Sequence, residues 1–150
     1  MVTKIISGAQ TGADRAGLDA ALALGLDVGG WITRGRRTDE GPLSPEDFIR
    51  YKLKEHPSRA YPPRTEQNVL ESDATVLFGY MHSPGCKLTI RLCLRHGKRY
   101  KANPTVDELC RLLLGEWGSV RVLNVAGNRE RTNPGTYQRT YDTLVEALRW

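Results

Sequence analysis

The sequence predicts an α/β domain of the Rossmann-like, doubly wound type, in which helices cover both faces of a mostly parallel sheet. Short β-branched segments alternate with segments whose apolar residues recur at helical spacing, as in β-α-β units. Such units place their strands in parallel and bury both faces of the sheet. No repeat, linker or low-complexity segment interrupts the 150 residues, so we expect one domain over 1–150.

The first three elements lead from a buried strand into a helix and back to a strand. The β-branched run 3–7 predicts a strand that stops at Gly8. Apolar residues at helical spacing predict a helix over 14–24, with Gly25 as its C-cap. A second strand is expected over 26–32, where two glycines weaken it.

The middle of the chain contains more loop. The polar, Gly- and Arg-rich segment 33–44 predicts a loop, and a short helix is expected over 46–54. Three prolines predict an irregular segment over 56–63. Helix-forming residues follow over 65–72, and the apolar run 74–80 is the strongest strand signal in the chain.

The last part of the chain resumes the alternation of helix and strand. Apolar residues at helical spacing predict helices over 87–95, 106–114 and 137–148. Strands are expected over 99–102 and 120–125.

The chain is basic, and its arginines are scattered along the sequence. The formal net charge is +5 at pH 7, and no run of five like charges occurs. Scattered arginines are typical of a solvated surface, and nucleic acid is a less favoured partner. An anionic ligand in a cleft explains the charge equally well, because the planar fork of arginine recognises phosphate.

The cysteines and the hydropathy of the chain limit the classes of protein to which it can belong. The three cysteines are odd in number and lack paired spacing, which suits a reducing compartment. No CxxC or Cys/His cluster predicts a metal site. No signal peptide precedes the first strand, and no apolar run reaches the 18 or so residues of a membrane helix. We therefore expect a cytoplasmic protein without a membrane segment.

The loop over 7–14 is the first candidate ligand site, because ligands of such sheets bind beyond the carboxyl ends of the strands. Gly8 and Gly12 permit a sharp turn and a close approach, and the following helix offers free N–H groups. Thr11 adds a hydroxyl, and Asp14 is the expected N-cap. A tight turn without a ligand explains the same residues. The loop is neither a Walker A loop nor a dinucleotide fingerprint.

Similar chemistry follows other strands. The loop 79–89 leads from the strongest strand into a helix N-terminus, and two such loops on neighbouring strands would form opposite lips of one crevice. Gly35 with Arg36 and Arg37, Arg64 with Thr65, and the segment 124–129 supply further donors, although solvated loop arginines are the alternative. The expected ligand-binding residues are Gly8, Ala9, Gln10, Thr11, Gly12, Asp14, Arg15, Trp31, Gly35, Arg36, Arg64, Thr65, Asn68, Gly79, Tyr80, Ser83, Gly85, Cys86, Lys87, Thr89, Gly127 and Arg129.

The sequence assigns no catalytic residue. Asp14 and Glu66 could pair as acid and base, but a cap and a first-turn helix residue explain them as well. Cys86, beside Lys87 at a helix N-terminus, could have a lowered pKa and act as a nucleophile or metal thiolate. A buried structural cysteine is the alternative.

Five segments together carry a resemblance to a known family: GAQTGADR at 8–15, GGW at 29–31 with Gly35 and Arg36, Tyr61 with RTEQNV at 64–69, SDAT at 72–75, and NVAG at 124–127. The chain resembles the molybdenum carrier family (molybdenum cofactor carrier-like proteins). That family belongs to a Rossmann-like superfamily with DprA and LOG-type proteins. The resemblance implies a homo-oligomer, dimeric or tetrameric, that binds molybdenum cofactor, a related pterin, or a molybdate- or tungstate-type oxyanion.

One departure from the LOG-type pattern P-G-G-x-G-T-x-x-E weighs against hydrolysis. Cys86 and Leu88 replace the second and third glycines, and Leu92 stands at the position of the catalytic glutamate. An aliphatic side chain cannot exchange protons.

The leading hypothesis is therefore non-enzymatic carriage or storage of a phosphate-bearing nucleotide-like or pterin-like ligand such as molybdenum cofactor. The alternative is a sponge or sensor for a nucleotide-derived signal, such as a cyclic nucleotide or an ADP-ribose derivative. In that case Trp31, Tyr61 and Tyr80 could stack on a base. A nucleotide hydrolase and a DNA-binding protein rank below these two.

Overall fold

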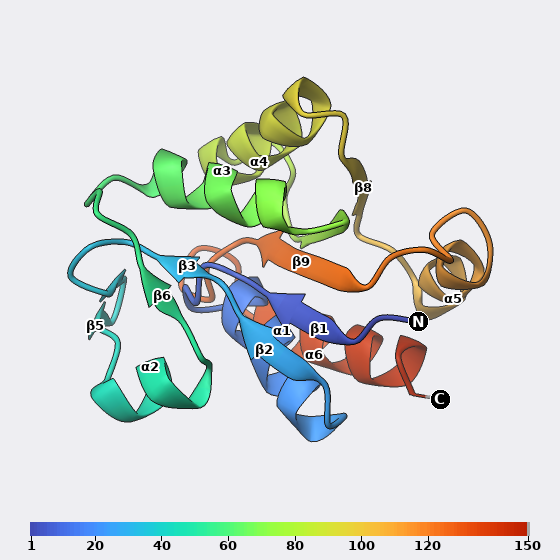
Figure 1. The fold of residues 1–150 in the computed structure, drawn as a ribbon, viewed down its shortest axis with the longest axis horizontal. Coiled ribbons are helices and arrows are strands. Elements are labelled where there is room, and N and C mark those ends of the chain that lie inside the picture. The colour runs from blue at the N-terminus through green and yellow to red at the C-terminus, as the bar shows by residue number, and fades with distance from the viewer. Residues whose placement is uncertain (150) are drawn as a thin grey trace.

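A five-stranded, wholly parallel sheet in the order β2-β1-β9-β7-β8 forms the centre of the molecule (Figure 1). The computed structural model describes residues 1–149. The strands are β1 (Lys4–Ile6), β2 (Asp27–Gly29), β7 (Ala74–Phe78), β8 (Arg99–Ala102) and β9 (Val122–Gly127). The chain runs outward from β1 to β2 and, on the other side, from β7 to β8. The last strand, β9, fills the gap between these two halves.

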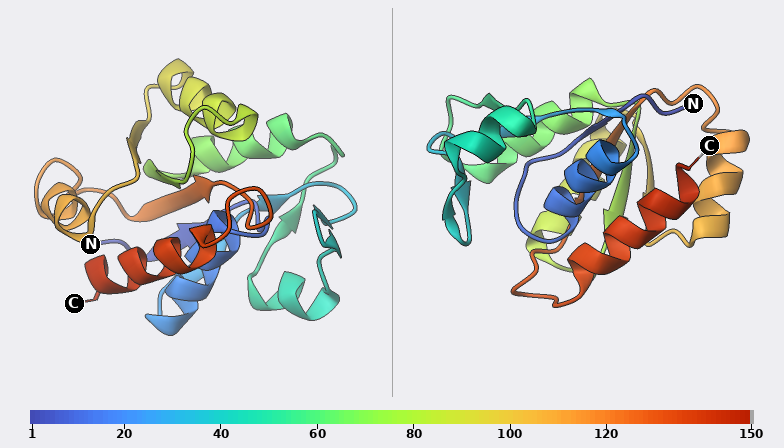
Figure 2. Two further views of the ribbon diagram at one scale, coloured as in Figure 1. Left: turned by 180° about the vertical axis from the view of Figure 1, so that it is seen from behind. Right: turned by 90° about the horizontal axis from the view of Figure 1, so that it is seen from below.

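Helices cover both faces of this sheet (Figure 2), which confirms the Rossmann-like class that the sequence predicts. α1 (Ala13–Ala23) and α6 (Thr136–Ala147) pack against each other on one face, with α5 (Val106–Leu114) beside α6. α3 (Tyr61–Glu71) and α4 (Pro84–Arg95) pack together on the other face. None of the helices in residues 1–149 is long and apolar enough to cross a membrane.

The segment between β2 and α3 forms a separate layer beside the sheet, where the sequence prediction was partly wrong. One strand was expected over 26–32, but Gly30 separates β2 from β3 (Trp31–Ile32). Gly30 has φ +127°, and a Cβ there would overlap the carbonyl oxygen of Ser7. The chain therefore leaves the central sheet at Gly30, and β3 pairs instead with β6 (Lys54–Glu55).

Two more short strands, β4 (Arg37–Thr38) and β5 (Gly41–Pro42), form an antiparallel pair inside the segment expected to be a loop. They are followed by α2 (Pro45–Arg50), which is shorter than the predicted helix over 46–54. Strands of two residues are too short for an alternating pattern to reveal them.

Prolines explain the remaining differences at helix starts. α3 begins at Tyr61, inside the segment predicted to be irregular, and Pro62 and Pro63 occupy its first turn. A missing N–H is harmless there, because the first turn has no intrahelical acceptor for it. α4 likewise starts early, at Pro84, with the Ser83 hydroxyl accepting from the Cys86 N–H.

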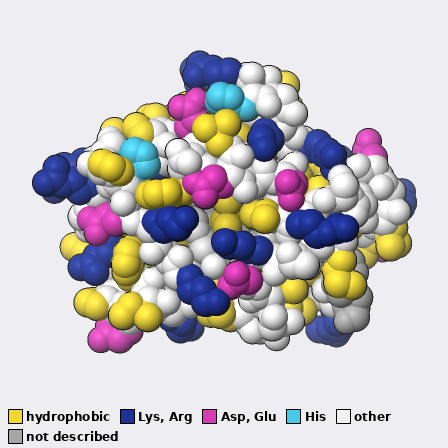
Figure 3. Space-filling model, viewed as in Figure 1, with side chains coloured by type: hydrophobic (Ala, Val, Ile, Leu, Met, Phe, Trp, Pro, Cys, Tyr) yellow, Lys and Arg dark blue, Asp and Glu magenta, His cyan; other side chains and the backbone are white. Residues whose placement is uncertain are grey.

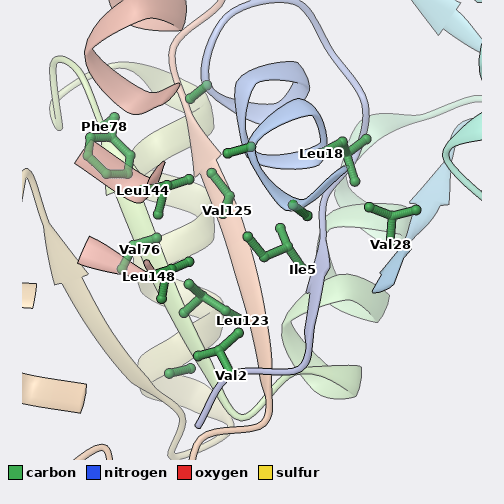
Figure 4. Close-up of a cluster of buried hydrophobic side chains, with 14 of the residues drawn as sticks. Val2, Ile5, Leu18, Val28, Val76, Phe78, Leu123, Val125, Leu144 and Leu148 are labelled. Carbon is green, nitrogen blue, oxygen red and sulfur yellow. The ribbon is translucent and has the colours of Figure 1, made fainter. Parts of the chain in front are cut away.

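The apolar core lies between the sheet and the α1/α6 face (Figure 4). Leu123 and Val125 of β9 lie at its centre with Leu144 of α6, and all three are fully buried. α1 approaches β9 closely because residue 17 is glycine: a Cβ there would lie 2.6 Å from the Cβ of Val125. This contact fixes the start of α1 beside the carboxyl end of β9.

The face of the molecule in Figure 3 carries basic side chains that stand apart from one another among acidic and apolar ones. A nucleic-acid surface would present a basic stripe. On this face the scattered charge corresponds to the pattern in the sequence.

Candidate functional site

A cleft opens at the carboxyl ends of β1 and β9, bounded by the first turns of α3 and α4. Its volume of about 100 Å³ is smaller than the roughly 300–1,000 Å³ of a site that encloses a drug-sized ligand, and suits a phosphate-sized group. The lining residues are Gly8, Gln10, Asp14, Arg64, Thr65, Asn68, Gly85, Thr89, Asn124, Val125, Ala126, Gly127 and Arg129. The cleft lies where the two halves of the sheet diverge, the usual ligand position in such folds.

The loop between β1 and α1 forms one wall of the cleft and is held by its own polar groups. The Ser7 hydroxyl donates to the Asp14 carbonyl at 2.9 Å and accepts from the Ala9 N–H at 3.1 Å. Ala9 itself has φ +59°, an unusual conformation for a residue with a side chain. Strain of this kind concentrates at functional sites.

The sequence-based role of Asp14 as N-cap was wrong. Gly12 occupies the N-cap position of α1, with φ +81° and no side-chain bond. Asp14 lies in the first turn of α1, buried, and its Oδ2 accepts from the Gln10 N–H at 3.3 Å. The carboxylate therefore faces the cleft and closes the loop.

Asp14 and Arg64 give the cleft its charge. Burial raises the pKa of Asp14, although the charge of Arg64 and, to a smaller extent, those of Arg15 and Arg129 oppose this. Burial also lowers the pKa of Arg64, but an arginine stays protonated at any physiological pH. Among the ion pairs within 4 Å in residues 1–149, none joins Arg64 to a carboxylate.

The guanidinium of Arg64 is the most informative group in the cleft. It lies against Gly8, and its Nη1 donates to the Thr65 hydroxyl at 2.9 Å. Its Nε is buried and has no hydrogen-bond partner. A buried donor without an acceptor is costly, by about 1–3 kcal/mol and more for a charged group. An anion in the cleft would supply that acceptor.

The opposite wall depends on Asn128, which belongs to the segment 124–129 named from the sequence but was not among the expected ligand-binding residues. Its Oδ1 accepts from the Tyr80 N–H at 2.5 Å, and its Nδ2 donates to the Ser83 hydroxyl at 3.1 Å. This buried amide ties the end of β9 to the loop after β7. That loop was expected to face the first loop from a neighbouring strand, but β9 lies between β1 and β7.

Comparison with known proteins agrees with this architecture. The model of the circularly permutated YpsA SLOG family matches residues 5–148. The chain belongs to that family. A similar solved structure is the crystal structure of a "putative molybdenum carrier protein" from Syntrophus aciditrophicus SB, with a TM-score of 0.87 and 34% identity over 98% of this chain and 95% of that one. Comparison with curated proteins gave no match. The resemblance noted from the sequence is thereby confirmed.

In this SLOG-family chain, the cleft gathers ten of the residues that the sequence analysis expected at the ligand: Gly8, Gln10, Asp14, Arg64, Thr65, Asn68, Gly85, Thr89, Gly127 and Arg129. Twelve others lie outside its lining: Ala9, Thr11, Gly12, Arg15, Trp31, Gly35, Arg36, Gly79, Tyr80, Ser83, Cys86 and Lys87. Asn124, Val125 and Ala126 also line the cleft; they belong to the segment 124–129 named from the sequence but were not among the expected ligand-binding residues.

Several of the residues outside the cleft have other contacts. The Trp31 indole donates to Glu71, and the Arg36 guanidinium lies 5.6 Å from the centre of the Phe48 ring. Arg15 donates to the carbonyl of Ala9 at 3.2 Å. These side chains hold the loops that surround the cleft.

The structure also bears on the chemical alternatives. Burial raises the pKa of the Cys86 thiol, which contradicts the hypothesis of an activated thiolate and supports the structural one. Leu92 is buried with Val69 and Cys93 between α3 and α4. The Glu66 carboxylate oxygen Oε2 lies 2.8 Å from the His96 Nε2, and Glu66 does not line the cleft. Within residues 1–149, no cluster of three His, Cys, Asp or Glu side chains is placed to hold a metal ion.

Proposed function

We propose that this protein binds a phosphate-bearing small molecule, nucleotide-like or pterin-like, in the cleft and carries or stores it unchanged. The observation that carries this proposal is the buried, partnerless Nε of Arg64 at the cleft. The cleft volume of about 100 Å³ suits a tetrahedral anion, with the rest of the ligand lying outside. The hydroxyls of Thr65 and Thr89 and the glycine backbone at Gly8 would surround the same group.

Molybdenum cofactor is the leading ligand in this proposal. The support is the solved relative that is named for molybdenum carriage, together with a cleft that fits the terminal phosphate of a pterin. Free molybdate or tungstate, also tetrahedral dianions, would fit the same donors. The proposed role for this chain's residues is to hold the anion, with Arg64 as the charged donor.

The alternative, a sponge or sensor for a nucleotide-derived signal, has less support from the aromatic residues. The Trp31 ring packs edge-on against His56, and arginines lie over the Tyr61 ring. Tyr80 is exposed but pairs with His82. Stacking of a base on Trp31 or Tyr61 would require these contacts to break.

Thermal shift and calorimetry with a panel of anions test the proposal. The panel contains inorganic phosphate, molybdate, a pterin phosphate, AMP and ADP-ribose. A ligand at 100 times its Kd stabilises the folded state by about 2.7 kcal/mol, which a melting curve resolves easily. We expect a shift for the wild type, a loss of that shift in Arg64→Gln, and no change in Arg91→Gln, an exposed position on α4. The proposal fails if no member of the panel shifts the wild type.

Chromatography of the ligand after incubation separates carriage from catalysis. We expect the ligand to be recovered intact. Conversion of AMP to adenine and ribose 5-phosphate would replace carriage by hydrolysis.

A further inference from the structure

Three arginines from separate segments meet at one aromatic ring at the mouth of the cleft. Tyr61 is the first residue of α3, and its ring centre lies 5.3 Å from the Cζ of Arg37, 5.3 Å from that of Arg64 and 5.1 Å from that of Arg129. Arg64 and Arg129 line the cleft, whereas Arg37 in β4 is exposed and lies outside the lining, next to the same ring. We refer to Arg37, Arg64 and Arg129 as the arginine cluster.

The positive charge of the arginine cluster is poorly compensated. Among residues 1–149, no carboxylate oxygen lies within 4 Å of any of the three guanidinium groups. The nearby carboxylate is Asp14. Burial raises its pKa, and the charges of Arg64 and Arg129 oppose that rise. Within the cluster, Arg64 and Arg129 thus share one negative charge, and the charge of Arg129 adds in a small way to the burial that lowers the pKa of Arg64.

The Tyr61 ring explains how these like charges are held together. Contact with the face of a ring attracts a guanidinium and leaves its N–H edge free to donate. The ring is itself tied to the first loop, since the Gln10 amide lies 3.5 Å from the Tyr61 hydroxyl. The ring therefore positions guanidinium groups without neutralising them, which is the arrangement that an anion site needs.

We propose that the arginine cluster is a second anion subsite adjoining the cleft, so that the ligand carries two adjacent phosphates. This inference rests on the proposed function, because it assumes that the first phosphate occupies the cleft beside Arg64. One phosphate there leaves Arg37 and Arg129 without a counter-charge. A second phosphate at Tyr61 pairs with both, and Arg64 lies between the two groups. The ligand class is a diphosphate ester, whose organic part is either a pterin or a nucleoside.

Calorimetry at fixed ionic strength compares inorganic phosphate with pyrophosphate, and ADP-ribose with 6-hydroxymethyl-dihydropterin diphosphate. The wild type is expected to bind pyrophosphate at least about tenfold more tightly than phosphate, as one added charge-assisted contact predicts. Arg37→Gln should remove most of that preference while leaving phosphate affinity within about threefold. Arg129→Gln, a change in the cleft lining, should weaken pyrophosphate binding more than phosphate binding. Arg91→Gln, which makes the same charge change away from the cleft, controls for general electrostatics.

Replacement of the ring gives an independent test. Tyr61→Phe keeps the aromatic face and should retain the preference, whereas Tyr61→Leu should lose it. Melting curves show whether each variant is folded, and the exposed Arg37→Gln remains informative if Tyr61→Leu does not fold.

The outcomes separate the two proposals. Equal affinity for phosphate and pyrophosphate, or equal losses of both in the variants, overturns the second subsite and leaves phosphate binding in the cleft intact. Failure of all four compounds to bind overturns the subsite together with the proposed function. A pyrophosphate preference supports the subsite, and the tighter of the two esters then identifies the organic part.

Discussion

Replacement of Gly8 by alanine should remove the ligand from the cleft while leaving the fold intact. A Cβ at this position would lie 2.5 Å from the Cζ and 2.6 Å from the Nη1 of Arg64, and the three nearest atoms all belong to that side chain. A flexible guanidinium can move, so the backbone need not. Displacement of Arg64 forfeits its bond to Thr65, worth about 0.5–1.5 kcal/mol. The lower entropy of the unfolded alanine chain offsets about 0.4–1 kcal/mol of this.

The free energy of unfolding of Gly8→Ala should therefore stay within about 1 kcal/mol of the wild type. Binding should suffer much more, because the displaced group is the charged donor in the cleft. Loss of a hydrogen bond to a charged group is worth about 1.5–3 kcal/mol, or roughly a 10- to 150-fold rise in Kd. Urea denaturation measures the first quantity, and calorimetry with the anion that binds the wild type measures the second.

Gly12→Ala is the matched control on the same loop. Gly12 has φ +81°, and a Cβ there would overlap the backbone carbonyl oxygen of Asn128. Neither constraint can relax through a side chain, so this variant should lose several kcal/mol of stability. The role of Arg64 is refuted if Gly8→Ala binds the anion as well as the wild type. It is also refuted if Gly8→Ala is destabilised as much as Gly12→Ala.

Buried polar groups lead to three further predictions. Burial raises the pKa of Asp14 above 3.8, so its ionisation destabilises the fold as the pH rises from 3.8 through the folded pKa. Asp14→Asn should gain stability relative to the wild type over that range in urea titrations from pH 3 to 8, by about 1.4 kcal/mol for each pH unit that the range spans. Asn128→Ala should cost about 1–3 kcal/mol, because it removes the two bonds through which the buried Asn128 amide holds the Tyr80 N–H and the Ser83 hydroxyl. Cys86 should react with iodoacetamide at about pH 7.5 far more slowly than a free thiol until urea unfolds the chain.

Each of these predictions has a contradicting result. A difference between Asp14→Asn and the wild type that shrinks as the pH rises would mean that the carboxylate is stabilised in the fold. An Asn128→Ala variant of wild-type stability would mean that the two loops are joined by other contacts. Rapid alkylation of Cys86 in the folded protein, measured by mass spectrometry against Cys110 as the half-buried reference, would restore the reactive-thiolate hypothesis.

The sequence was sufficient for the class of fold but not for the strand order. Alternating strand and helix patterns predict a parallel sheet, and five of the strands occur close to the predicted positions. The insertion of β9 between β1 and β7 depends on packing between distant segments, such as Gly17 against Val125. Local patterns contain no information about such contacts.

The same limit applies to the candidate site. Gly8 and Arg64 were predicted because glycine and arginine have distinctive chemistry at strand ends. Arg36 was selected and Arg37 was not, although Arg37 is the residue that reaches Tyr61. Arg36 lies just before β4 with φ +53°, whereas Arg37 is the first residue of β4, and a two-residue strand gives no pattern from which to choose between them.

Native mass spectrometry of the purified protein tests the central claim most directly, because it detects a retained small molecule and its composition together. We expect the wild type to retain one phosphorus-containing molecule per chain and Arg64→Gln, purified in the same way, to retain none. The same molecule at equal occupancy in both proteins, or a retained molecule without phosphorus, would contradict the claim.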